Sequence, residues 1–132
     1  MAKTGKAKEI SVRVKNDIGA GANLMRVLAN AKINVIAFIG WTANPQLGVL
    51  QFITDDSGRA TRALQKAGYE ADAHEVVWTE MPNRPGALAE AAEKLAAAQV
   101  NIEYAYATTT EKQSALAIFK VDDAAKALKA LG

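Results

Sequence analysis

Hydrophobic side chains in the N-terminal half of the chain change their spacing from one segment to the next. Apolar and polar residues alternate where a strand has one solvated face, and apolar residues recur every three or four positions where a helix is amphipathic. The pattern predicts a strand, a helix, two strands joined by a loop, and a second helix, at residues 10–14, 24–31, 34–41, 49–54 and 60–67. Beyond Gly68 the chain is expected to stay extended from Tyr69 to Met81.

The C-terminal half repeats this order. Its strands and helices are expected at residues 77–81, 88–98, 102–108, 115–121 and 123–131. The order β-α-β-β-α, closed by one more strand, is that of the ferredoxin-like fold. We therefore predict an α+β protein of two ferredoxin-like βαββαβ repeats, each an antiparallel sheet with helices on one face, in which the second repeat lacks its last strand.

A constant offset relates the two halves, because Asn83 follows Asn16 at the same separation as Phe119 follows Phe52. The shared asparagine, glycine, phenylalanine and Asp-Asp positions fall at the ends of elements, so alanine-rich helices alone do not explain the match. The predicted organisation is a disordered basic tail over residues 1–8, a first repeat over residues 9–74 and a second over residues 75–132.

Two features predict that the protein associates with another chain. The unfinished second sheet would leave a bare edge, which proteins usually cover; the long segment from Tyr69 to Met81 could instead serve both sheets, but we favour association. Residues 35–41 are also apolar on both faces, whereas a sheet covered on one side should alternate. A homodimer is expected.

Composition narrows the function. The chain has 132 residues, half of them hydrophobic, a net charge of +2 and no cysteine. The positive excess comes largely from Lys3, Lys6 and Lys8, so the body is near neutral, which argues against a phosphate-tracking surface. No apolar run could cross a membrane, and the N-terminus lacks the apolar stretch of a signal peptide. We expect a cytoplasmic protein that does not bind membranes.

One polar motif occurs in both repeats. Asn-x-x-Gly lies at a turn from strand to helix, and a further asparagine opens the next strand: Asn16, Gly19 and Asn34 in the first repeat, and Asn83, Gly86 and Asn101 in the second. Free N–H groups at a helix N-terminus favour a carboxylate, and asparagine can both donate and accept. The motif would suit a small zwitterion, although asparagine and glycine are also common in turns for structural reasons.

The second repeat resembles a known family. The run Asn83-Arg84-Pro85-Gly86-Ala87-Leu88, followed by Leu95 and by Val100-Asn101-Ile102, is similar to the signature of ACT domains. These are ferredoxin-like regulatory modules that bind amino acids, usually between two copies. The nearest likeness is to the serine-sensing domain of phosphoglycerate dehydrogenase, where asparagines corresponding to Asn83 and Asn101 contact the effector. Met81 stands here where that domain has a contacting histidine.

The resemblance implies a stand-alone regulatory protein that binds a free amino acid, with no catalytic residues, metal or cofactor. The implied ligand-binding residues are Asn83, Arg84, Pro85, Gly86, Ala87, Leu88, Asn101 and Ile102, with Asn16, Gly19 and Asn34 as a second, divergent set. Because the second repeat has the fuller motif, the stronger site is expected at Asn83 and Asn101, with Met81 or Tyr104 in the pocket that selects the side chain.

Other functions have weaker support. His74 is the only histidine, and no ligand-spaced cluster surrounds it. The pairs Asp55-Asp56 and Asp122-Asp123 are interpreted as helix caps, with Asp122 capping the last helix. A ferredoxin-like nucleic-acid-binding module would need exposed aromatics and basic residues on central strands, where only Phe52 and Phe119 are available. A small ferredoxin-like enzyme would need a nucleophile and base, and no such pair is evident.

Overall fold

The computed structural model describes residues 3–132. Helices and strands in this part of the chain follow the order β1 (Thr4–Lys15), α1 (Ala20–Asn30), β2 (Val35–Asn44), β3 (Leu47–Thr54), α2 (Ser57–Lys66), β4 (Ala71–Pro82), α3 (Ala87–Ala97), β5 (Ile102–Thr109), β6 (Ser114–Val121) and α4 (Ala124–Leu131). They form two compact units. The first unit is Lys8–His74, and the second is Glu75–Gly132 with the described residues up to Ala7.

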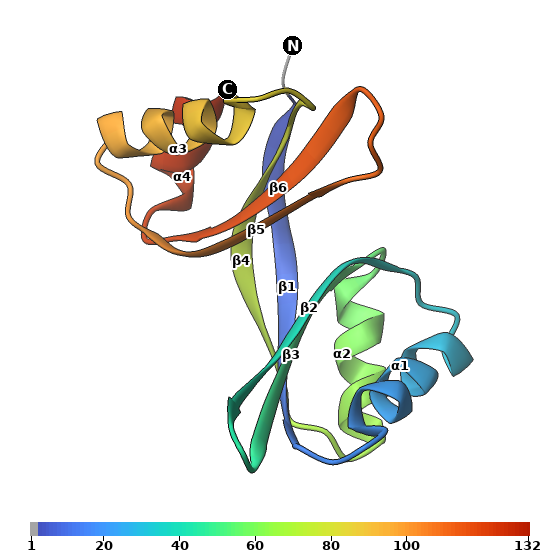
Figure 1. Cartoon of the computed structure of the whole chain (residues 1–132). Helices are drawn as coiled ribbons and strands as arrows, with labels where there is room; N and C mark the ends of the chain where they lie inside the picture. Colours follow the sequence, from blue (N-terminus) through green and yellow to red (C-terminus); the bar gives the residue numbers. More distant parts are fainter. Residues whose placement is uncertain (1–2) are drawn as a thin grey trace. The chain divides into compact units, whose positions relative to one another are not determined.

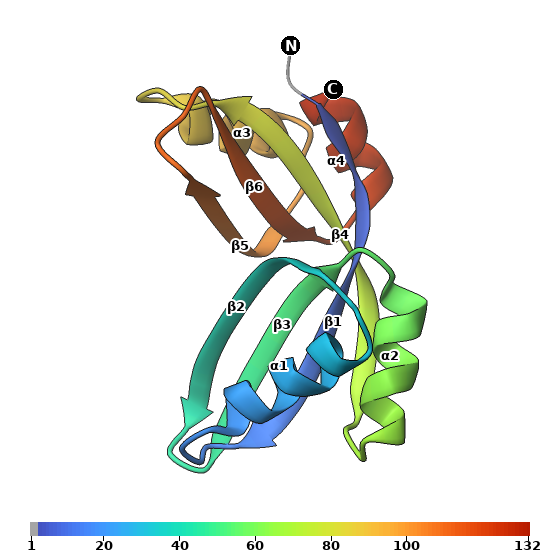
Figure 2. The ribbon, with the colours of Figure 1, turned by 90° about the vertical axis from the view of Figure 1, so that its right-hand side faces the viewer.

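The first unit contains an antiparallel sheet with the strand order β2-β3-β1-β4. Helices α1 and α2 lie on one face of this sheet, as the ribbons of Figures 1 and 2 show. Phe52 on β3 pairs with Ile10 on β1 and Phe38 on β2, and the side chain of Phe52 is fully buried. The core of the unit is built from the helix-facing positions of the strands and the apolar stripes of the helices, among them Ile10, Val12, Leu24, Leu28, Phe52, Ala60 and Leu64.

The second unit repeats this arrangement with the strand order β1-β4-β6-β5. Helices α3 and α4 cover one face. Phe119 on β6, which corresponds to Phe52, pairs with Val77 and Ala105 and is 1% exposed. The core of this unit contains Val77, Met81, Ala91, Leu95, Val100, Phe119, Val121, Ala127 and Leu131. The predicted α+β class and the two ferredoxin-like repeats are confirmed.

The fourth strand of the second unit is the N-terminal part of β1. The second repeat has no strand after α4 within residues 3–132, as predicted. In its place, the carbonyl of Lys3 accepts a hydrogen bond from the amide of Glu80 at 2.7 Å, and the hydroxyl of Thr4 donates to the carbonyl of Trp78 at 2.8 Å. Gly5 lies against the indole ring of Trp78. The edge of β4 is therefore covered by the same chain.

Two expectations are corrected here. Thr4–Lys8 is part of a strand and not a disordered tail; Met1 and Ala2, which the same prediction included, lie outside the described residues. The edge beside β4 needs no second chain. Sequence pattern misses this segment because Thr4–Ala7 has little strand propensity of its own. Hydrogen bonds to β4 and the Lys6–Glu75 ion pair at 3.6 Å hold it instead.

Strand β4 serves both units, as the alternative interpretation of the segment from Tyr69 to Met81 predicts. Residues up to His74 complete the sheet of the first unit, and residues from Glu75 onward form the strand of the second unit that pairs with β6. Strand β1 is divided in the same way, between Ala7 and Lys8. The second repeat therefore obtains its fourth strand from the N-terminal end of the chain.

Candidate functional site

The predicted turn motif has the same backbone geometry in both units. In the first unit the amide nitrogen of Asn16 donates to the carbonyl of Gln46, and its Nδ2 donates to the carbonyl of Pro45, both at 3.0 Å. Gly19 follows with φ of 85° and is the N-cap of α1. The side chain of Asn16 thus ties the β1–α1 turn to the hairpin loop between β2 and β3.

The second unit reproduces these contacts. The amide nitrogen of Asn83 donates to the carbonyl of Gln113, and its Nδ2 donates to the carbonyl of Lys112, both at 2.9 Å. Gly86 has φ of 86° and is the N-cap of α3. A positive φ explains the glycine at each position. A Cβ on Gly19 or Gly86 would meet no neighbouring group within 4 Å, so both turns are open to their surroundings.

The four helices of residues 3–132 differ in how their N-termini are satisfied. Asp56 caps α2 by accepting from the amide of Arg59 at 3.0 Å, and Asp123 caps α4 by accepting from the amide of Lys126 at 3.1 Å. Helices α1 and α3 have no side-chain cap. Their first turns therefore present backbone N–H groups, which favour an anionic group. The predicted cap Asp122 is wrong by one position, because Asp123 is the capping residue.

The first aspartate of each pair has a different role. Asp55 Oδ1 accepts from the amide of Asn34 at 3.1 Å, and Asp122 Oδ1 accepts from the amide of Asn101 at 3.0 Å. Each aspartate amide in turn donates to the carbonyl of the same asparagine. The backbone of each strand-opening asparagine is thereby fixed, and the residue itself is exposed.

The two asparagines of one repeat lie at opposite ends of their sheet. Asn83 is bonded to the loop before β6, and Asn101 is bonded to Asp122 just after β6. Because β6 has 8 residues, a rise of about 3.3 Å per residue separates the two asparagines by roughly 25 Å. One copy of the motif therefore cannot bring both of its asparagines to the same small zwitterion. A ligand could contact both types of asparagine only if they came from different modules.

The residues between the motif asparagine and the helix differ between the two units. In the second unit the guanidinium of Arg84 binds the carboxylate of Glu90 with nitrogen–oxygen distances of 2.8 and 3.2 Å. This hydrogen-bonded ion pair lowers the pKa of Glu90 and raises the pKa of Arg84 from their ordinary values. Of the other predicted residues, Ala87 is buried, Leu88 is 48% exposed, Pro85 is exposed and Ile102 is partly buried.

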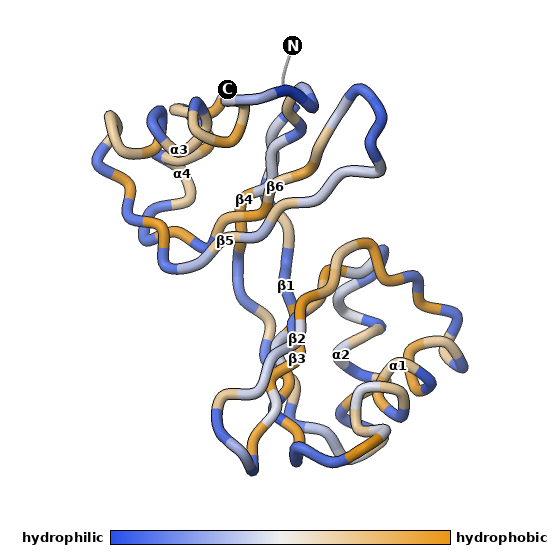
Figure 3. Tube along the Cα trace, viewed as in Figure 1, coloured by the Kyte–Doolittle hydropathy of each residue, from blue (hydrophilic) through white to orange (hydrophobic). Residues whose placement is uncertain are grey.

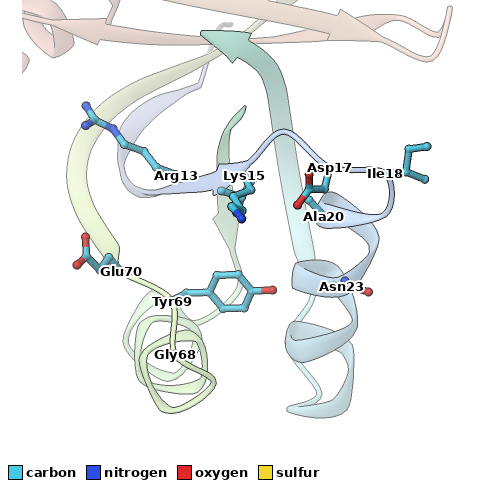
Figure 4. Close-up of a pocket in the computed structure, with 10 residues that line it drawn as sticks. Arg13, Lys15, Asp17, Ile18, Ala20, Asn23, Gly68, Tyr69 and Glu70 are labelled. Atoms are coloured by element: carbon cyan, nitrogen blue, oxygen red, sulfur yellow. The ribbon is translucent and has the colours of Figure 1, made fainter. Parts of the chain in front are cut away.

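In the first unit the same region opens on a cavity of about 600 Å³ (Figure 4). It lies at the C-terminal end of β1, beside the start of α1 and the connection from α2 to β4. Its lining residues are Arg13, Val14, Lys15, Asp17, Ile18, Ala20, Asn23, Gly68, Tyr69 and Glu70. A second hollow of about 260 Å³ adjoins the same turn and includes Asn16 and Trp41.

Sequence reasoning missed most residues of the large cavity. Lys15, Asn23 and Tyr69 come from three separate segments and form no motif with a fixed spacing. The usable signal was Gly68, which ends a helix and places the next residue at the same end of the sheet as the β1–α1 turn. Of the predicted set, Asn16 lines only the smaller hollow, and Asn34 lies at the opposite end of the sheet.

The structure also bears on the alternative functions. Phe52 and Phe119 are 0% and 1% exposed, so they cannot stack on bases as the aromatics of nucleic-acid-binding sheets do. His74 lies 3.0 Å from Glu9 across neighbouring strands. Residues 3–132 contain no cluster of three or more His, Asp or Glu side chains that could hold a metal ion. None of the described helices is long and apolar enough to cross a membrane.

Comparison with known proteins adds the family. A family model described as an ACT domain pair matches residues 6–131. Protein BT0572 from Bacteroides thetaiotaomicron is 30% identical, with a TM-score of 0.90 over 97% of this chain and 88% of that chain. The regulatory subunits of aspartate kinase from Thermus thermophilus (ligand-free form) and Thermus flavus are each 19% identical, which shows likeness of fold.

The TM-scores of these two regulatory subunits are 0.72 and 0.66, over 98% of this chain and over 93% and 94% of theirs. No curated protein matches. The finer likeness of the second repeat to a serine-sensing domain stays a prediction. The match to the family model extends over both repeats, including both turn motifs, and the ferredoxin-like units agree with it. The chain belongs to the family of ACT domain pairs.

Proposed function

We propose that this protein is a non-catalytic regulatory module that binds a free amino acid or a similar small zwitterion. The observation that carries the proposal is the difference among the helix N-termini. Aspartates cap α2 and α4, whereas α1 and α3 begin behind left-handed glycines without a side-chain cap. The uncapped ends are the two that carry the predicted motif, and their N–H groups suit a carboxylate.

The proposed effector site lies between two ACT modules. One module would contribute the turn, Asn83–Leu88 or Asn16–Gly19, and the other would contribute the exposed side chain of Asn101 or Asn34. This division follows from the separation of the two asparagines within a unit. The Oδ1 atoms of Asn16 and Asn83 are available to an ammonium group, since the Nδ2 atoms are used by the hairpin loops. Ile102 follows Asn101 at the start of β5.

A thermal-shift screen of the twenty amino acids tests the proposal. A few charge-assisted contacts correspond to dissociation constants of about micromolar to millimolar, or roughly −4 to −8 kcal/mol. Binding then stabilises the folded state by mass action. At least one amino acid should raise the melting temperature at millimolar concentration. If none of the twenty does so, the proposed function is wrong.

Single substitutions locate the effector site. Asn101→Ala should remove most of the shift and Asn34→Ala should reduce it, because both residues are exposed and their backbone contacts would remain. Asn30→Ala, at the exposed C-terminal end of α1, is the matched control and should leave the shift unchanged. A full shift in both Asn101→Ala and Asn34→Ala would exclude the proposed asparagine contacts.

We also propose that the protein is a cytoplasmic homodimer that pairs along β2. This strand is at the edge of its sheet and exposes Ile36, Phe38 and Trp41 by 57%, 47% and 43%. Figure 3 shows hydrophobic residues along the first part of β2. Phe38→Glu should convert a dimer into a monomer in light scattering after size-exclusion chromatography. The corresponding change in β5, Ala105→Glu, is the control.

A further inference from the structure

Two positions at the β1–α1 turn of the first unit carry different side chains from the corresponding positions of the second unit. By the constant offset between the repeats, Asp17 corresponds to Arg84 and Asn23 corresponds to Glu90. Arg84 and Glu90 bind each other in front of α3. Asp17 and Asn23 form no hydrogen bond with each other and line the cavity instead. The two repeats therefore share the backbone of this turn and differ in its side chains.

Charged groups of both signs surround this cavity without pairing. Arg13 and Lys15 are the cations, and Asp17 and Glu70 are the anions. The ion pairs found in the described residues, 3–132, include none of these four. Opposite charges that face one space without neutralising each other can be satisfied together by a ligand that carries both charges.

Figure 4 shows how the side chains that line this cavity lie around it. The Tyr69 ring extends from the α2–β4 connection toward α1, and Lys15 is next to the ring. The hydroxyl of Tyr69 is directed to the side of Asp17 and Asn23. Arg13 and Glu70 lie on the other side of the ring. A cationic amine, a hydroxyl and an amide on one side of the space are donors for a carboxylate, and Asp17 is an acceptor for an ammonium group.

We propose that this cavity is a second binding site for a small zwitterion, formed inside the first unit and separate from the effector site between modules. The carboxylate of the ligand binds Lys15, Tyr69 and Asn23, and the ammonium group of the ligand binds Asp17. The volume of about 600 Å³ is within the usual range of ligand pockets and exceeds the space that these two groups fill. The remainder, between Arg13 and Glu70, admits a polar side chain of the ligand. The ligand class rests on the proposed function, whereas the location and contacts do not.

Titrations followed by two-dimensional ¹H–¹⁵N NMR test the site. The probes are the twenty free amino acids, and for each that binds, its N-acetyl and carboxamide derivatives. Binding should perturb the amides of residues 17–23 and 68–70. Removing either charge of the probe should raise its dissociation constant at the cavity by at least about tenfold, the effect of losing one good charge-assisted contact.

Substitutions of cavity residues provide the second arm. Lys15→Gln and Tyr69→Phe should each weaken binding, measured by the perturbation at residues 17–23 and 68–70, by about tenfold or more. The double substitution Asp17→Arg with Asn23→Glu should abolish it, because it removes the acceptor for the ammonium group and one donor to the carboxylate, and introduces the Arg–Glu pair of the second unit. Lys129→Gln, at an exposed position in the last turn of α4, is the matched control and should change nothing. The NMR spectrum of each variant reports whether it is folded.

The outcomes separate this proposal from the proposed function. If an amino acid binds and Lys15→Gln and Tyr69→Phe leave every perturbation unchanged, the cavity site is overturned and the effector site between modules remains. If Asn101→Ala removes all perturbations, including those at residues 68–70, the cavity is likewise not an independent site. If none of the free amino acids binds, both proposals fail.

Discussion

The two units have nearly the same turns and different surfaces around them. Gly19 and Gly86 have φ values of 85° and 86°, and Asn16 and Asn83 bond to equivalent hairpin loops. Yet Arg84 of the second unit forms an ion pair with Glu90, whereas Asp17 and Asn23 at the corresponding positions of the first unit line a cavity. Duplication has thus preserved what the backbone requires and has left the exposed side chains free to diverge. A motif shared by both repeats therefore predicts the backbone conformation of the turn better than it predicts which ligand the turn binds.

The units also differ in how each obtains its fourth strand. The first unit uses the start of β4, which follows α2 directly, whereas the second uses Thr4–Ala7 from the other end of the chain. Because β1 and β4 each have residues in both units, unfolding of one unit should affect the strands of the other. Substitutions in the two units test how far this likeness and this difference extend.

Truncation of the central phenylalanines should have the largest effect. Phe52→Ala and Phe119→Ala each remove a fully buried ring, and such changes cost about 3–5 kcal/mol of the free energy of unfolding. Urea unfolding should show a similar loss for both. Fluorescence of Trp41 in the first unit and Trp78 in the second, each observed with the other replaced by Phe, should give one common midpoint because the strands are shared.

Two separate midpoints, with each phenylalanine variant lowering only the midpoint of its own unit, would contradict this coupling. The units would then be independent domains joined by β1 and β4.

Gly5→Ala should have the next largest effect. An added Cβ would lie 2.8 Å from Cζ2 of the Trp78 ring, so the ring or the strand must move. Overpacking of this kind costs about 1–3 kcal/mol. Urea unfolding measures the loss, and hydrogen exchange at the amide of Glu80, which donates to Lys3, should become faster.

Gly21→Ala in α1 is a control of opposite sign. A Cβ there meets nothing within 4 Å, and alanine in a helix should add about 0.4–1 kcal/mol. A loss of stability for Gly21→Ala equal to that for Gly5→Ala would show that the contact with Trp78 is not the cause.

The aspartate caps should give an intermediate effect that is equal in both units. Asp56→Ala and Asp123→Ala each remove one hydrogen bond to the first turn of a helix, and loss of an N-cap costs about 1 kcal/mol. Thermal unfolding measures both. Asn30→Ala, outside any cap, should change the midpoint little. If only one of the two aspartate substitutions lowered the midpoint of thermal unfolding, the equivalence of the two units would not extend to α2 and α4.

Glu90→Gln should have the smallest effect on stability, since the pair with Arg84 is exposed and such pairs contribute little. The folded pKa of Glu90 is lowered, so its contribution is present above the ordinary glutamate pKa and is lost as pH falls through the lowered folded value. Wild type and variant should therefore differ in melting temperature slightly at pH 7 and become equal at a pH well below about 4. A difference that persists unchanged in acid would exclude the charge on Glu90 as its cause.

Much of the fold could be predicted from local pattern. The alternation at Ile10, Val12 and Val14 identifies the helix-facing side of β1, because a strand repeats every two residues. Leu24 and Leu28 identify the buried stripe of α1 by helical spacing. The strand Thr4–Ala7 could not be found in this way, since its partners on β4 are distant in the chain and its own side chains carry no apolar alternation.

The candidate site was predicted less completely than the fold. Asn16 and Asn83 belong to the turns as expected, but Asn34 and Asn101 lie at the other ends of the sheets. Helix α1 or α3 lies between the two asparagines of a repeat and carries the chain back along the sheet before the next strand begins. Lys15, Asn23 and Tyr69 carry no local signal of a common cavity. They are neighbours only because a turn and a helix end meet at the same end of the first unit.

Local sequence specifies the elements, the duplication and the ACT-like turns, because helix periodicity, strand alternation and glycine turns are encoded by neighbouring residues. Only the tertiary structure shows which segment completes the second sheet, that the two asparagines of each repeat lie at opposite ends of their sheet, and which charged residues surround a cavity. Those outcomes depend on contacts between residues distant in the chain, such as Lys3 with Glu80, and local pattern carries no information about them.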